Sequence, residues 1–210
     1  MAKRVSVDAS LRGESSHRSP VALLLIDVIN PFAFEGAEEL HRHALPAARR
    51  IRELRDLADE ARWPVVYVND NFGHWSSDFR ATVELSRRAR LGEGRIPQLL
   101  EPRDTDYFVL KPRHSGFYLT PLELLLQSLE ARRIILTGFA TNICVLYTAA
   151  DAHMRGFEVV VPADCAAAED EVIHRFALEE MERSCHARIT TAEELARSHS
   201  LGTRARRRGG

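Results

Sequence analysis

The chain has 210 residues, of which 45% are hydrophobic and 28% charged, a composition typical of a soluble globular protein. This composition excludes disordered chains, collagen-like fibres and disulfide-dense mini-proteins. The 29 Lys and Arg residues nearly balance the 30 Asp and Glu residues, which gives a net charge of −1. Because proteins that bind nucleic acid usually carry a basic excess, we expect no nucleic-acid partner.

The two ends of the chain differ in composition from its middle. Residues 1–19 are polar and are expected to form a flexible leader, and residues 20–200 are expected to form one domain. Residues 201–210 form a basic tail, which we expect to be disordered, with contact to phosphate or an acidic partner as the alternative. The first apolar run, Val21–Ile26, is too short for a membrane span, so we expect no membrane partner.

Strand-like and helix-like segments alternate along the domain. The expected strands are residues 20–26, 64–68, 106–110, 133–137, 157–161 and a short sixth at 187–190. The expected helices are a stretch opened by Pro46 and residues 79–89, 121–130, 142–154, 170–183 and 192–198. This alternation predicts an α/β fold with three α-β-α layers and a mostly parallel, about six-stranded, Rossmann-like sheet.

Chemically active side chains follow three of the expected strands. Asp27 follows the first strand, Lys111 the third, and Cys144 lies shortly after the fourth. Each has an ordinary alternative role, as a turn cap, an edge charge or a small buried thiol. Because the carboxyl ends of parallel strands share one edge, where open α/β sheets bind ligands, we expect the three to form one site.

The surroundings of Cys144 indicate a nucleophile. Thr141 is a candidate N-cap that would put Cys144 in the first helical turn, where the helix dipole and Lys111 would stabilise a thiolate. Asp27 could take the thiol proton and return it to a leaving amine. The backbone N–H groups of Ala140 and Cys144 are candidates for an oxyanion hole.

The other two cysteines, Cys165 and Cys185, lack such a charged setting and are expected to be structural. The three cysteines are odd in number and widely spaced, and no C-x-x-C pair occurs. Reduced thiols and a cytoplasmic location are therefore expected.

Three motifs together resemble those of the isochorismatase-like cysteine hydrolases, the group with nicotinamidases, N-carbamoylsarcosine amidases and ureidoacrylate amidohydrolases. They are LIDVINPF at 25–32, KPRHSGF at 111–117 and TGFATNICV at 137–145, and residues 149–164 also resemble the family. The likeness covers about residues 20–190.

The resemblance implies a catalytic triad of Asp27, Lys111 and Cys144 and hydrolysis of a small-molecule amide, carbamoyl or ureide C–N bond through a thioester. It also implies a cis peptide at Phe139–Ala140 and a homodimer or homotetramer. Two alternatives stay open, namely a vinyl-ether hydrolase of the isochorismatase type and a non-catalytic interaction module.

The sequence also departs from the family pattern. Ile29 and Pro31 replace a Gln and an Asp that are common in the first motif. Metal-containing nicotinamidases carry Asp-x-His after the second strand, whereas this chain has Asn-Asp-Asn at 69–71, with His74 close by. We therefore expect no metal and no other cofactor.

Apolar side chains near these motifs are candidates for the wall of a substrate pocket, since such pockets are mostly apolar with few polar anchors. The candidates are Phe32, Phe72, Trp75 and Phe117. Asn71 could bind a substrate amide or form an Asx turn. Arg113 and His114 are weaker candidates for binding a substrate carboxylate.

Overall fold

The computed structural model describes residues 18–73, 79–89 and 91–208. Almost all of the expected leader therefore lies outside the described residues. Within them, seven strands form one sheet in the order β3-β2-β1-β4-β5-β7, with β6 paired to β4 and every pairing parallel. The strands are β1 (Val21–Ile26), β2 (Val65–Asp70), β3 (Tyr107–Lys111), β4 (Arg133–Phe139), β5 (Glu158–Pro162), β6 (Ala166–Ala167) and β7 (Arg188–Thr190).

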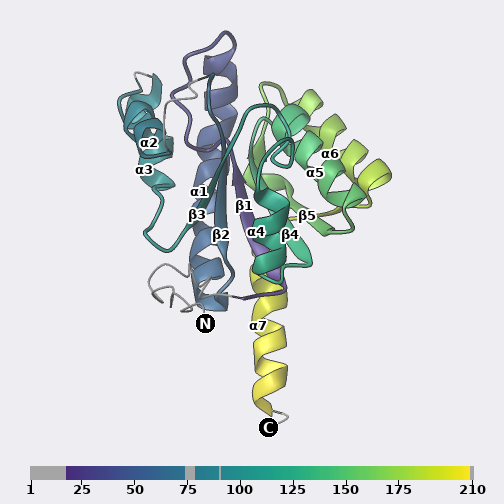
Figure 1. The fold of residues 1–210 in the computed structure, drawn as a ribbon. Coiled ribbons are helices and arrows are strands. Elements are labelled where there is room, and N and C mark those ends of the chain that lie inside the picture. The colour runs from purple at the N-terminus through teal and green to yellow at the C-terminus, as the bar shows by residue number, and fades with distance from the viewer. Residues whose placement is uncertain (1–17, 74–78, 90, 209–210) are drawn as a thin grey trace, which may run out of the picture.

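Helices cover both faces of this sheet, so the expected three-layer α/β fold is confirmed (Figure 1). The first face packs against α1 (Ala37–Ala61), α2 (Phe79–Arg87), α3 (Arg95–Leu99) and α7 (Ala192–Arg208). The second face packs against α4 (Leu122–Ser128), α5 (Leu146–Met154) and α6 (Glu171–Cys185). Three short helical turns complete the described part: η2 (Leu91–Gly94), the π turn η3 (Thr141–Val145) and η4 (Ala163–Cys165).

The central position of β1 follows from its sequence. Leu23 and Leu25 point to the first face, whereas Leu24 and Ile26 point to the second, and all four are fully buried. A strand that is apolar on both sides is stable only where helices cover both faces of the sheet. The continuous apolar run therefore places β1 between β2 and β4, in the middle of the molecule.

The first helix begins earlier than the sequence analysis predicted. Pro46 does not open α1 but lies inside it, and the helix begins at Ala37 after Gly36. An interior proline removes one backbone hydrogen bond and crowds the preceding turn. The buried stripe continues on both sides of it, through Leu40 and Ile51, so packing against the sheet outweighs that cost.

The end of the chain also differs from the expectation. The last helix does not stop near residue 198 but runs to Arg208, so residues 201–208, where we expected disorder, continue α7. In the described part of the chain, no helix is both long enough and apolar enough to cross a membrane.

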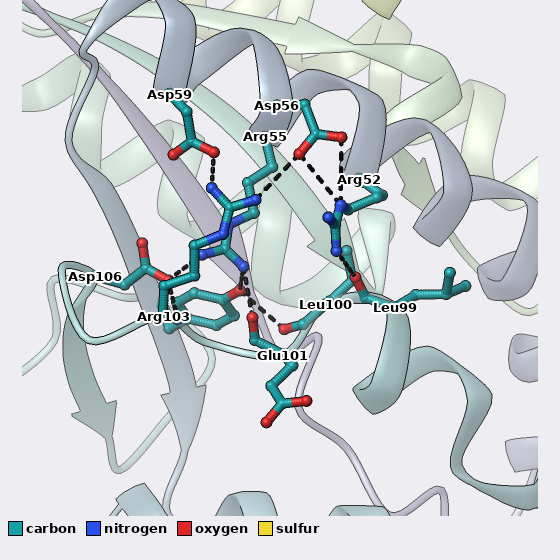
Figure 2. Close-up of polar contacts among 10 residues, drawn as sticks. Arg52, Arg55, Asp56, Asp59, Leu99, Leu100, Glu101, Arg103 and Asp106 are labelled. Atoms are coloured by element: carbon teal, nitrogen blue, oxygen red, sulfur yellow. Dashed lines mark hydrogen bonds and ion pairs between the residues drawn. The ribbon is translucent and has the colours of Figure 1, made fainter.

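A buried arginine ties α1 to the edge of the sheet (Figure 2). Arg55 is fully buried, and its guanidinium forms an ion pair with Asp106. It also donates to the Tyr67 hydroxyl at 2.7 Å and to the Glu101 carbonyl at 2.6 Å. Tyr67 in turn donates to the Leu100 carbonyl at 2.9 Å. The network holds α1, β2 and the segment before β3 together.

The close approach of β1 and β4 requires a glycine at position 138. Gly138 has φ of +120°, and a Cβ built there would lie 2.0 Å from the Ile26 carbonyl oxygen and 2.7 Å from the Ile26 nitrogen. Both contacts are with backbone, which cannot rotate away. A side chain at this position would force apart the carboxyl ends of the two central strands.

We therefore expect Gly138→Ala to reduce the free energy of unfolding by about 3 kcal/mol, as overpacking of a rigid site does. Gly156→Ala is the matched control, because Gly156 also has a positive φ, of +80°, but nothing lies within 4 Å of a Cβ there. Its cost is the backbone strain alone, about 1 kcal/mol. Urea unfolding measures both, and equal losses would show that the contact with Ile26 has no effect.

Candidate active site

The candidate site lies where the strand order reverses. β1 is followed along the chain by β2 on one side of it, and its other neighbour is β4. Parallel sheets leave a crevice for ligands beyond the strand ends at such a switch point. Asp27 directly follows β1, Lys111 is the last residue of β3, and Cys144 lies in the turn η3 after β4.

Asp27 and Lys111 form a buried ion pair. The Lys111 Nζ lies 2.8 Å from Asp27 Oδ2, and the two residues are 0% and 5% exposed. The other carboxylate oxygen, Asp27 Oδ1, accepts a hydrogen bond of 2.7 Å from the Asp70 backbone N–H. Both oxygens of Asp27 are therefore held, and the carboxylate has a fixed orientation toward the strand end.

Cys144 completes the cluster. Lys111 Nζ donates to Cys144 Sγ at 3.5 Å, and the Asp27 carboxyl is near enough to the thiol to raise its pKa. A carboxylate and a thiol from distant parts of the sequence thus both contact the ammonium of Lys111. The structure brings together the three residues that follow the strands in the sequence.

The protonation of the cluster differs from our expectation of a resting thiolate. Burial and the negative charge of Asp27 raise the pKa of the Cys144 thiol, and the Lys111 charge offsets only part of this. Burial likewise raises the pKa of Asp27, against the opposing effect of Lys111. One buried cation balances one anion, so Asp27 and Cys144 compete for a single negative charge and the thiol keeps its proton at rest.

Lys111 stays charged in this arrangement. Burial lowers the pKa of Lys111, but the charge of Asp27, with smaller contributions from Cys144 and Asp70, raises it more, so its pKa lies above the ordinary value. The ammonium is therefore a permanent positive charge between the carboxylate and the sulfur. It stabilises whichever of the two groups is ionised.

The turn that carries Cys144 is a π turn and not the start of a regular α-helix. The peptide bond between Phe139 and Ala140 is cis, and the Ala140 carbonyl accepts from the N–H groups of Ile143 and Val145, each at 3.2 Å. Thr141 does not act as the expected N-cap: the cap is Ala140, without a side-chain hydrogen bond, and the Thr141 hydroxyl contacts His174 instead.

Asp70 is a member of the cluster that the sequence analysis did not single out. It ends β2, and its Oδ2 lies 3.6 Å from Lys111 Nζ. Its Oδ1 accepts from the Phe72 backbone N–H at 2.7 Å. Asp70 follows a buried strand in the same way as Asp27, so the reasoning that identified Asp27 applies to it equally.

A family model for the isochorismatase domain matches residues 21–194 of this chain. The chain belongs to the isochorismatase family. An uncharacterised isochorismatase family protein, YaaI of Bacillus subtilis, is 40% identical over 174 residues, which cover 83% of this chain and 95% of that protein. The ureidoacrylate amidohydrolase RutB of Methylobacterium radiotolerans is 40% identical over 187 residues, which cover 76% of this chain and 72% of that protein.

Solved structures of the isochorismatase fold agree with this assignment. The N-carbamoylsarcosine amidase of Thermoplasma acidophilum superposes with a TM-score of 0.65 at 24% identity, covering 83% of this chain and 97% of that one. The nicotinamidase of Staphylococcus aureus superposes with a TM-score of 0.61 at 22% identity, covering 82% and 98%. At such identities these likenesses show that the chain has the same fold.

The expected substrate-binding residues differ from one another in where they lie relative to the site. Phe32 is buried beside the site, with its ring 6.4 Å from that of Phe139, which precedes the cis peptide. The Asn71 side chain accepts from the Gly73 N–H at 2.9 Å, so the Asx-turn alternative holds for its oxygen. Trp75 and His74 lie outside the described residues.

Phe117, the fourth expected substrate-binding residue, belongs to the apolar core of the second face. Its ring is buried 5.8 Å from that of Phe157, with the Arg155 guanidinium 5.0 Å from its centre. Phe157 precedes β5 and so lies at the amino end of the sheet, opposite Cys144. The loop after Lys111 runs along the second face of the sheet, where the Phe117 ring packs in the core. Arg113 and His114 on the same loop are exposed.

The described residues contain no cluster of three or more His, Cys, Asp or Glu side chains arranged to hold a metal ion. Cys165 and Cys185 are buried, unpaired thiols away from the charged cluster. The polar chemistry of the described site is therefore that of Asp27, Lys111, Cys144 and Asp70.

Proposed function

We propose that this isochorismatase-family hydrolase cleaves the C–N bond of a small amide, carbamoyl or ureide compound with Cys144 as the nucleophile. The observation that carries the proposal is the buried contact of Lys111 Nζ with both Asp27 Oδ2, at 2.8 Å, and Cys144 Sγ, at 3.5 Å. A thiol next to a fixed carboxylate and a fixed cation has the base and the counter-charge that a cysteine nucleophile needs.

In the first half of the reaction, Sγ attacks the substrate carbonyl carbon as its proton passes to Asp27. The C–S bond forms, and the carbonyl electron pair moves to oxygen, which we propose is stabilised by the N–H groups of Ala140 and Cys144. The C–N bond then breaks, and Asp27 gives its proton to the leaving nitrogen. A thioester on Cys144 and a free amine or ammonia result.

In the second half, Asp27, again a carboxylate, takes a proton from a water molecule that attacks the thioester carbonyl. The C–S bond breaks, the acid leaves, and the proton returns to sulfur. The raised pKa of the thiol suits this cycle, because sulfur is ionised only while the proton is on Asp27. Lys111 balances the negative charge that passes between Asp27 and Cys144 throughout.

The relatives support a C–N bond as the target. The ureidoacrylate amidohydrolase and the N-carbamoylsarcosine amidase named above both act, by their names, on such bonds. Neither a vinyl-ether hydrolase nor a non-catalytic interaction module requires a buried ammonium that contacts both a buried carboxylate and a thiol. The cluster therefore favours the amidohydrolase over both alternatives.

Cys144→Ala is expected to decrease ammonia release by more than about 10³-fold, because removing a nucleophile eliminates the covalent route. The measurement is ammonia release from nicotinamide, N-carbamoyl amino acids, ureidoacrylate-like compounds, biuret and maleamate. Cys165→Ala is the matched control, since this buried cysteine lies outside the cluster. Equal rates in wild type and Cys144→Ala would show that Cys144 is not the nucleophile.

A further inference from the structure

A histidine on a different helix holds the turn that carries the nucleophile. His174 of α6 places its Nδ1 2.8 Å from the Thr141 hydroxyl oxygen. Thr141 is the first residue of η3 and is fully buried, so its hydroxyl is shielded from bulk water. Buried hydroxyl groups are usually hydrogen-bonded, and the partner of the Thr141 hydroxyl is the imidazole of His174.

A neighbouring backbone group favours one form of the His174 ring. The backbone of Ala163 raises the pKa of His174, as a carbonyl that accepts from a protonated ring nitrogen does. In the neutral ring only one nitrogen carries hydrogen, so donation to Ala163 leaves the other free to accept from the Thr141 hydroxyl. The ring is thus suited to accept the hydrogen bond from Thr141 at the start of η3.

The surroundings of the ring favour this neutral form. Burial lowers the pKa of His174, and the charge of His43 on α1 lowers it further, while the Ala163 backbone and Glu171 oppose the shift. His174 lines a cavity of about 350 Å³ between α1 and the start of α6. The other charged or titratable residues around that cavity are Arg50, Asp164 and Asp170.

The position of η3 depends on few other polar contacts of its side chains. The fold around it is held by apolar packing of α5 and α6, through residues such as Ala149 and Leu178. The Thr141–His174 bond, in contrast, acts at the residue that directly follows the cis peptide and begins the Cys144 turn. Loss of this hydrogen bond is therefore expected to move η3 while the surrounding fold stays intact.

We propose that His174 is a positioning residue, whose hydrogen bond to Thr141 fixes η3 so that Cys144 Sγ stays in contact with Asp27 and Lys111. The role rests on the proposed function, because it matters only if Cys144 is the nucleophile. The hydrogen bond of His174 is with Thr141, and the structure gives none from its ring to Asp27, Lys111 or Cys144 among the described residues, so we expect it to act on the sulfur through Thr141.

Thr141→Val and His174→Ala test the proposal by removing the two ends of the bond. Each is expected to reduce kcat about 10- to 100-fold with KM nearly unchanged, since a displaced nucleophile slows the chemical step. The double variant should be no slower than the slower single variant, because both remove one interaction. Thr141→Ser retains a hydroxyl and His174→Asn retains a hydrogen-bond acceptor, so each of these variants should keep most of the wild-type kcat.

The pH profile of iodoacetamide alkylation at Cys144 is the second readout and needs no substrate turnover. In Thr141→Val and His174→Ala it should move toward that of an ordinary thiol, with a pKa of about 8.5, because Sγ leaves the influence of Asp27. Arg175→Ala, at an exposed site on the same helix, is the control and should leave both readouts unchanged.

These readouts separate the two proposals. If the wild type releases no ammonia from any compound of the panel, the proposed function fails, and the alkylation profile alone decides on His174. Lower thermal stability with unchanged kcat and unchanged alkylation would show that His174 is merely structural. Additive losses in the double variant, or a rise in KM alone, would also overturn the positioning role.

Discussion

Asp27→Asn is expected to abolish turnover and, at the same time, to make the Cys144 thiol ionise at lower pH. Burial and the charge of Asp27 both raise the pKa of Cys144, whereas Lys111 lowers it. An amide in place of the carboxylate leaves the lysine without its main counter-charge, so a thiolate takes that place. Without a proton acceptor, however, kcat should fall by about 10³-fold.

The opposite shift is expected for Lys111→Gln, which removes the cation and should raise the pKa of the thiol further. Alkylation of Cys144 by iodoacetamide across a pH series, followed by mass spectrometry of the Cys144 peptide, measures both shifts. Cys144→Ala shows the contribution of the two other cysteines. If the pKa of Cys144 from this profile is unchanged or higher in Asp27→Asn, the view that Asp27 and Cys144 compete for one proton is contradicted.

Asp106→Ala is expected to reduce the free energy of unfolding by about 3–5 kcal/mol, as the removal of one partner from a buried ion pair does. The loss arises because the Arg55 guanidinium, which is fully buried, would keep its charge without a counter-ion (Figure 2). Asp106 also accepts from the Arg103 backbone N–H at 2.6 Å, and this bond would be lost as well.

Asp56→Ala is the matched control in the same network. Asp56 pairs with Arg52 and Arg103, but its side chain is 53% exposed. Exposed ion pairs contribute at most about 1 kcal/mol. Urea unfolding of the two variants therefore compares a buried with an exposed carboxylate, and similar losses would show that burial of Arg55 has little effect.

The sequence predicts the strands well because they are continuous apolar runs bounded by polar residues. The run at residues 20–26 becomes the central strand β1, and the position of Asp27 directly after it follows from that assignment. The same reasoning places Lys111 at the end of β3. These features depend on local pattern and on the geometry of a parallel sheet, both of which are visible in a sequence.

Features that depend on contacts between distant residues were predicted less well. The start of α1 is set by packing on both sides of Pro46, and the thiol form of Cys144 by burial together with Asp27. The two-residue strand β6 exists only through its pairing with β4. Phe117 is a candidate for the pocket wall because it is an apolar side chain near the motifs, yet its ring packs 5.8 Å from that of Phe157.

Mass spectrometry of protein quenched in acid during turnover tests the covalent mechanism most directly, with the compound of the panel that is hydrolysed fastest. The mechanism predicts that the peptide containing Cys144 gains the mass of the substrate's acyl group, and that Cys144→Ala shows no such gain. Steady ammonia release without any acyl group on Cys144, or with the acyl group on another residue, would contradict it.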